Sequence, residues 1–163
     1  MQTPDMYAMQ IPINPRGVMG FWDHAGPAEW AEVLATFPLF ADVPERRLRA
    51  LVRQATFAEY GAGDVVIEQG APGDSLYVIL SGSARARGRP AARTLGVGDY
   101  FGELGLLDGV PRSATVAATS ELHVMRVPRQ AFLGLAEHYP TISLRMLSRL
   151  GSQIRRLEAQ PAA

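Results

Sequence analysis

Short β-type runs separated by glycine-containing turns occupy the middle of the chain and limit most strongly what it can fold into. These runs are residues 56–60, 65–68, 76–80, 83–87, 94–97, 113–118 and 121–127, and the turn-forming glycines are Gly61, Gly63, Gly70, Gly73 and Gly82. The polar segment Arg89–Arg93 predicts a hairpin loop. Many short strands at regular spacing are typical of a β-sandwich or β-barrel. We therefore expect a mainly β fold with strands at about residues 55–128.

Helical periodicity flanks the strands on both sides. One helix is predicted from Pro27 and a second with Pro44 in its first turn, where proline is well tolerated. Two more are expected at about residues 129–158, the longer of which carries an apolar seam at Leu147, Leu150, Ile154 and Leu157. Spacings of three and four residues place the seam on one helix face. It can pack on the strands, on a second subunit, or on both.

Chain length and the positions of proline and glycine indicate how the chain is divided into domains. Residues 1–24 show no periodicity and contain several prolines and glycines, which predicts an extended or disordered arm. The chain has 163 residues, enough for one domain with a proper core. We therefore expect a single domain at residues 25–163.

Composition argues against several classes of function. The formal net charge is zero, so no general attraction to nucleic acid or to an anionic membrane is expected. Cysteine is absent, which excludes disulfides and thiolate metal sites, and the three histidines lack metal-ligand spacing. No apolar run suits a membrane span and no secretion signal is found, so a cytoplasmic protein is expected. No nucleophile elbow, zinc-protease helix or Walker loop occurs, and we do not expect an enzyme.

The stretch Phe101–Val116, FGELGLLDGVPRSATV, carries the clearest chemical signal. Gly102 and Glu103 stand at the first turn of a short apolar helix, and Arg112 follows a Gly-Val-Pro turn. The first turn of a helix offers unpaired N–H donors at the positive end of the helix dipole. An arginine returning to that place would hold a phosphate through a forked pair of hydrogen bonds. The stretch therefore predicts a phosphate-binding site.

This stretch resembles the phosphate-binding cassette of the cyclic-nucleotide-binding domain. That domain is the sensor module of the catabolite activator protein, of cyclic-nucleotide-dependent protein kinases and of cyclic-nucleotide-gated channels. The glycine-punctuated stretch from Gly63 to Gly82 is similar to the strands that open the same domain. The resemblance runs from about residue 37 to about residue 157. It implies a stand-alone bacterial type with a double-stranded β-helix (a jelly-roll-like β-roll), N-terminal helices and a C-terminal helical lid.

The resemblance also implies a role for each residue of the site. Backbone N–H groups around Gly102 to Leu104 face the phosphate, Arg112 neutralises it, and Ser113 adds a hydroxyl or its own N–H. Glu103 accepts a hydrogen bond from the ribose 2′-hydroxyl. The last helix offers Arg149 and Gln153 as candidate caps on the purine. The full set of expected ligand-binding residues is Phe101, Gly102, Glu103, Leu104, Arg112, Ser113 and Ala114.

The expected function is a regulatory module that binds cyclic AMP or cyclic GMP and relays occupancy through its C-terminal helices. Cyclic AMP is favoured because it is the commoner ligand among bacterial relatives. The expected partners are an unknown effector protein and a second subunit joined through the last helix, without nucleic acid, membrane, metal or further cofactor. Two alternatives stay open. One is a ligand-free interaction module of the same fold. The other is a fragment of a catabolite-activator-type regulator, whose DNA-reading helices would have to follow Ala163.

Overall fold

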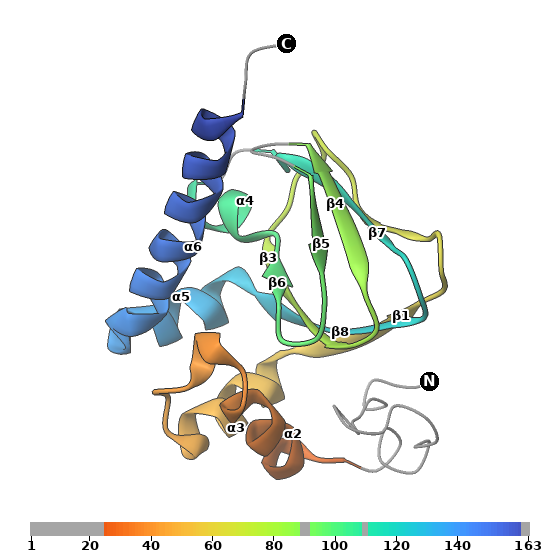
Figure 1. Ribbon diagram of the computed structural model, residues 1–163. Helices are drawn as coiled ribbons and strands as arrows, with labels where there is room; N and C mark the ends of the chain where they lie inside the picture. Colours follow the sequence, from red (N-terminus) through yellow and green to blue (C-terminus); the bar gives the residue numbers. More distant parts are fainter. Residues whose placement is uncertain (1–24, 89–91, 109–110, 161–163) are drawn as a thin grey trace.

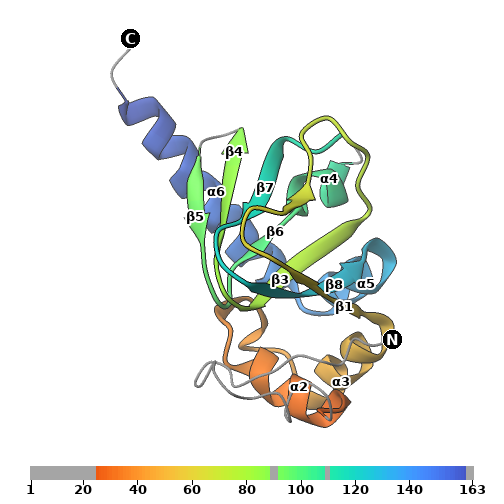
Figure 2. The ribbon, with the colours of Figure 1, turned by 90° about the vertical axis from the view of Figure 1, so that its right-hand side faces the viewer.

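Two antiparallel sheets form a roll, with helices packed against one of them (Figures 1 and 2). The computed structural model describes residues 25–88, 92–108 and 111–160; the arm expected at residues 1–24 lies outside this part. The first sheet has the order β1 (Thr56–Tyr60), β8 (Leu122–Pro128), β3 (Ser75–Ser81), β6 (Tyr100–Phe101). The second has the order β2 (Val65–Ile67), β7 (Ala114–Ala118), β4 (Ala84–Gly88), β5 (Arg93–Leu95). The expected mainly β fold with flanking helices is confirmed.

Strand β3 is covered on both faces and divides the core in two. Side chains alternate across a strand, so Leu76, Val78 and Leu80 pack with the helices. The side chains of Tyr77 and Ile79 face the interior of the roll, where they meet residues of β4, β5 and β7. The nearly continuous burial of β3 explains its apolar sequence, and the inner core lies close to the predicted phosphate site.

The N-terminal helices close one side of the first sheet. Helix α2 (Pro27–Ala35) starts with proline, and the Gly26 N–H donates to the Glu29 carboxylate over 2.9 Å. A short 3-10 helix, η1 (Pro38–Phe40), follows. Helix α3 (Glu45–Gln54) buries Leu48, Leu51 and Val52 on one face and exposes arginines on the other. This amphipathic pattern is what docks α3 against the sheet and α5.

The other three helices follow β6 and β8 along the chain. Helix α4 (Glu103–Asp108) comes directly after β6, and α5 (Arg129–His138) leads through Tyr139 into α6 (Pro140–Ala159). The face of α6 turned inward buries Ile142, Met146 and Gln153. Large apolar side chains on another face are exposed, namely Leu144, Leu147, Ile154 and Leu157. Most of the expected seam therefore does not pack on the described strands.

Within the described residues, no helix combines the length and the apolar character needed to cross a membrane.

Candidate functional site: a buried arginine between two glycines

The Arg112 side chain is buried, with 5% of the residue surface exposed. Its Nη1 donates to the Gly102 carbonyl over 2.9 Å, and its Nη2 donates to the Ser75 carbonyl over 3.1 Å. The guanidinium carbon lies 5.9 Å from the centre of the Tyr77 ring. These bonds use two of the five N–H groups of a guanidinium. Among the described residues, no carboxylate forms an ion pair with it.

Electrostatics make this site receptive to an anion. Burial lowers the pKa of Arg112 from its ordinary value, and Tyr77 and Asp74 partly offset the effect. Arginine nevertheless stays protonated near neutral pH. A cation removed from water without an anionic partner is costly. A small anion entering next to the guanidinium would recover part of that cost through charge-assisted hydrogen bonds.

Two glycines make the space that the guanidinium occupies. A Cβ atom on Gly73 would overlap the Nε and Cζ atoms of Arg112. A Cβ atom on Gly102 would lie 2.7 Å from Nη1 and 2.9 Å from the Ser75 carbonyl oxygen. Gly102 also has a φ of 90°, which side chains disfavour. The prediction that Gly73 is only a turn-former is therefore wrong, since it also makes room for Arg112.

Backbone hydrogen bonds join the two glycine-containing stretches at Arg112. The Gly70 N–H donates to the Arg112 carbonyl over 2.8 Å, and the Arg112 N–H donates to the Ala71 carbonyl over 2.9 Å. The loop between β2 and β3 thus holds the backbone of the residue that precedes β7 by two positions. This long-range pairing fixes where the Arg112 side chain starts, which local sequence reasoning does not reveal.

Glu103 opens helix α4 and is also buried, with 9% of its surface exposed. Its Oε2 lies 3.9 Å from Nη2 of Arg93. Arg93 was expected in a polar hairpin but is the first residue of β5, and its side chain is largely buried. The neighbouring residues 89–91 lie outside the described part. Nothing in the local sequence marks Arg93 as a neighbour of Glu103, because Glu103 opens α4 after a strand of the other sheet.

The two candidate purine caps lie on the inward side of α6. Nη2 of Arg149 donates to the Tyr100 carbonyl over 2.8 Å, and its guanidinium carbon stands 3.9 Å from the centre of the Tyr100 ring. Gln153 is buried. Arg149 therefore ties α6 to β6, two residues before Gly102. Its role toward a purine stays a prediction.

The remaining expected ligand residues lie near Arg112 along the chain but differ in burial. Phe101 is buried inside the roll, where its ring stacks on Tyr77 with centres 5.0 Å apart. Ser113 and Ala114 are half-buried where β7 begins. Leu104 lies in α4, and its side chain is outside the described part. Direct contact of these residues with a ligand stays a prediction.

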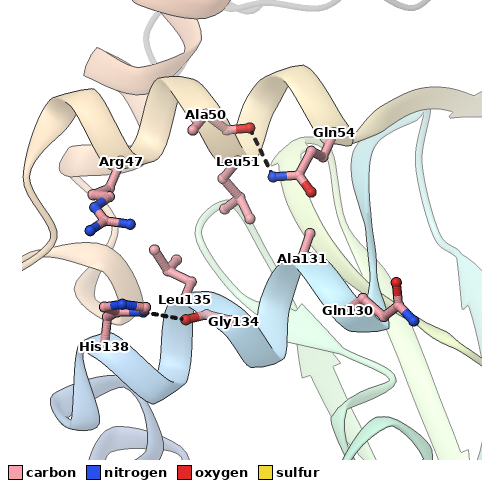
Figure 3. Close-up of a pocket in the computed structure, with 9 residues that line it drawn as sticks. All are labelled: Arg47, Ala50, Leu51, Gln54, Gln130, Ala131, Gly134, Leu135 and His138. Carbon is pink, nitrogen blue, oxygen red and sulfur yellow. Dashed lines mark hydrogen bonds between the residues drawn. The ribbon is translucent and has the colours of Figure 1, made fainter.

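Two surface hollows lie elsewhere. One, of about 240 Å³, lies between α3 and α5, and the side chains of Leu51, Ala131 and Leu135 point into the space between these helices (Figure 3). It contains none of the expected ligand residues. The other, of about 480 Å³, lies between α6, η1 and the turn before β6, and Arg149 lines it. Neither hollow includes Arg112 or Glu103.

A small polar cluster lies where β1 pairs with β8. Nε2 of His123 is 3.7 Å from the Glu59 carboxylate, and one ligand atom each from Glu59, Glu121 and His123 lie within 4.8 Å of one another. Sequence spacing did not indicate this grouping. Burial lowers the pKa of His123, and the two carboxylates oppose that effect.

Comparison with known proteins identifies a domain family. Residues 57–139 match a family model described as the cyclic nucleotide-binding domain. A CRP-like cAMP-activated global transcriptional regulator of Mycobacterium tuberculosis (strain ATCC 25618 / H37Rv) is 31% identical over 131 residues, which cover 77% of this chain and 58% of the relative. A cAMP-dependent protein kinase regulatory subunit of Aspergillus fumigatus is 42% identical over 88 residues, which cover 52% of this chain and 21% of the relative.

The architecture has solved counterparts as well. The crystal structure of Thermus thermophilus catabolite activator protein matches with a TM-score of 0.62 at 28% identity, covering 74% of this chain and 60% of that one. In each of these three comparisons the chain spans less than two thirds of the relative.

Proposed function

Because the chain belongs to the cyclic nucleotide-binding domain family, we propose that it is a regulatory module whose ligand, a cyclic purine mononucleotide, is held at Arg112. The observation that carries the proposal is a buried guanidinium without an ion-pair partner among the described residues, seated between Gly73 and Gly102. The ring phosphate of such a ligand has one negative charge. Placed at Arg112, it would supply the missing counter-ion.

The rest of the ligand has partners on the same side. The Gly102–Glu103 backbone lies next to the guanidinium, since Nη1 bonds the Gly102 carbonyl. The Glu103 carboxylate is assigned to the ribose 2′-hydroxyl, which is a hydrogen-bond donor. A hydrogen bond to a charged group contributes about 1.5–3 kcal/mol. Arg149 and Gln153 are assigned to the purine, which requires α6 to lie over the occupied site.

Cyclic AMP is the ligand we favour over cyclic GMP. The names of the Mycobacterium tuberculosis and Aspergillus fumigatus relatives both specify cAMP. Ser113, next to Arg112, is compatible with either purine. We assign the domain a binding role without turnover of the ligand, because the sequence carries no nucleophile elbow, zinc-protease helix or Walker loop.

The proposed relay starts at α4 and ends at α6. Leu106 of α4 is fully buried in the same core as Phe132 and Leu135 of α5. Packed cores tolerate few voids, so a shift of α4 on ligand binding must be taken up by α5 and then by α6. Binding changes the helix position only to the extent that the two positions differ in ligand affinity.

The output surface that we propose is the exposed apolar face of α6, which a second copy of the chain would cover. Its large side chains are Leu144, Leu147, Ile154 and Leu157, with 62%, 61%, 45% and 36% of their surfaces exposed. Leu147, Ile154 and Leu157, together with the half-buried Leu150, recur at spacings of three, four and three residues, which match the a and d positions of one coiled-coil seam. A homodimer would bring two such seams together, and an effector protein is the competing occupant.

Isothermal titration calorimetry with cyclic AMP and cyclic GMP tests the binding proposal. We expect the parent protein to bind cyclic AMP and Arg112→Ala to lose this binding. The variant should still unfold cooperatively on heating, which shows that it is folded. Arg87→Ala is the matched control, because Arg87 is an exposed arginine on β4. A folded parent protein that binds neither nucleotide would favour the ligand-free interaction module.

A further inference from the structure

Arg93 and Glu103 form an ion pair between the start of β5 and the start of α4. Arg93 begins β5 in the second sheet, whereas Glu103 follows β6 of the first sheet at the start of α4. The side chains keep only 17% and 11% of their surfaces exposed, and the joined atoms are 3.9 Å apart. A partly buried pair is screened by solvent much less than a surface pair. The contact therefore links the two layers beside the Arg112 site.

The charges around Arg93 direct it toward Glu103. Burial lowers the pKa of Arg93, the positive charge of Arg149 lowers it further, and Glu103 opposes both effects. Arg149 is held in place by the Tyr100 carbonyl and ring. The Asp99 carboxylate already accepts the Gly96 N–H over 2.8 Å. Glu103 is consequently the carboxylate with which Arg93 pairs in this region of the described chain.

The length of the contact leaves Glu103 able to accept a ligand. A separation of 3.9 Å is an ion pair but is too long for a hydrogen bond. Arg93 thus compensates the charge of the carboxylate without occupying its lone pairs. That compensation matters because a bound phosphate would place a second negative charge near Glu103, and like charges in a partly dry site repel each other.

We propose that Arg93 is a positioning residue for the sugar-binding carboxylate, holding Glu103 by charge so that it accepts the hydrogen bond of a ligand 2′-hydroxyl. This inference rests on the proposed function. It gives the two arginines different roles. Arg112 compensates the charge of the phosphate, and Arg93 compensates the charge of the Glu103 carboxylate beside it.

The test compares cyclic AMP with its 2′-deoxy analogue by calorimetry in the parent protein, Arg93→Gln, Glu103→Gln and the double variant. A hydrogen bond to a charged acceptor predicts that the parent protein binds the deoxy analogue about 10-fold or more weakly. Glu103→Gln should remove most of this difference, and Arg93→Gln should reduce it to a similar level. The double variant should discriminate against the deoxy analogue no less than Glu103→Gln alone, because both residues act on one hydrogen bond.

Two further variants distinguish positioning from a general structural role. Arg93→Lys keeps the charge and should restore part of the discrimination against the deoxy analogue. Arg87→Gln, on the exposed side of β4, should leave it unchanged. Thermal unfolding of every variant checks that the fold is retained.

Three results would overturn the inference. The first is a full parent-like penalty for the deoxy analogue in Arg93→Gln. The second is the same penalty in Glu103→Gln, which would mean that this carboxylate does not bind the hydroxyl. The third is an altered ratio of cyclic GMP to cyclic AMP affinity in Arg93→Gln with an unchanged deoxy penalty, which would place Arg93 at the base. Failure of the parent protein to bind any nucleotide would instead refute the proposed function, and the inference with it.

Discussion

Replacing Gly73 with alanine is expected to abolish tight ligand binding while leaving the fold intact. The added Cβ would overlap Nε and Cζ of Arg112, so the guanidinium must leave its position between the Ser75 and Gly102 carbonyls. Gly73 is not among the residues with positive φ, so alanine fits its backbone conformation. The clash is with a flexible side chain, which can turn toward solvent while β2 stays paired with β7 and β3 with β8.

The magnitude follows from the bond that is lost. A charge-assisted hydrogen bond between a guanidinium and a phosphate contributes about 1.5–3 kcal/mol, which corresponds to about a 10- to 150-fold increase in Kd. The free energy of unfolding should fall by about 1–3 kcal/mol, because Arg112 exchanges two carbonyl hydrogen bonds, each contributing about 0.5–1.5 kcal/mol, for bonds to water. Calorimetry with cyclic AMP and urea denaturation measure the two quantities.

Gly96→Ala is the matched control for this experiment. Gly96 precedes β6, has no positive φ, and a Cβ added there would meet no atom within 4 Å. Its variant should bind cyclic AMP like the parent protein. Parent-like binding by Gly73→Ala would refute the reasoning, since Arg112 would then work from another position. A collapse of the fold in Gly73→Ala would also contradict it, because only a side chain is expected to move.

Three further outcomes are expected. Leu106→Ala should lower the free energy of unfolding by about 2–4 kcal/mol in urea, because the side chain is fully buried; a loss under about 1 kcal/mol would contradict its place in the core. Burial lowers the pKa of His123, so the unfolded chain takes up that proton more readily, and stability should fall as pH drops below about 6.5. Urea titrations above and below about pH 6.5 should show that the free energy of unfolding depends less on pH in His123→Gln than in the parent protein. An unchanged pH dependence would refute the assignment of this effect to His123. Leu147→Glu should convert a dimer to a monomer in analytical ultracentrifugation, and a parent protein that sediments as a monomer would refute the homodimer.

Local sequence signals predicted most elements correctly. The helix beginning at Pro27, the apolar strand β3 and the helix beginning at Pro140 each follow from contacts and conformational preferences within a few residues along the chain. The positions of proline and glycine, and apolar residues that recur every two or about 3.6 positions, indicate such local structure directly. The cassette motif assigned Gly102 and Arg112 to one phosphate site, and in the structure Nη1 of Arg112 donates to the Gly102 carbonyl. Their binding of a ligand stays a prediction.

Only the tertiary structure decided which distant side chains meet. Gly73 makes room for Arg112, and Arg93 pairs with Glu103 from the other sheet, although sequence reasoning assigned the glycine to a turn and the arginine to a hairpin. The apolar seam of α6 carries the right spacing, yet its sequence cannot say whether the strands cover it. Each of these outcomes depends on how two separately formed layers dock. That docking is set by long-range packing, which a short window of sequence does not contain.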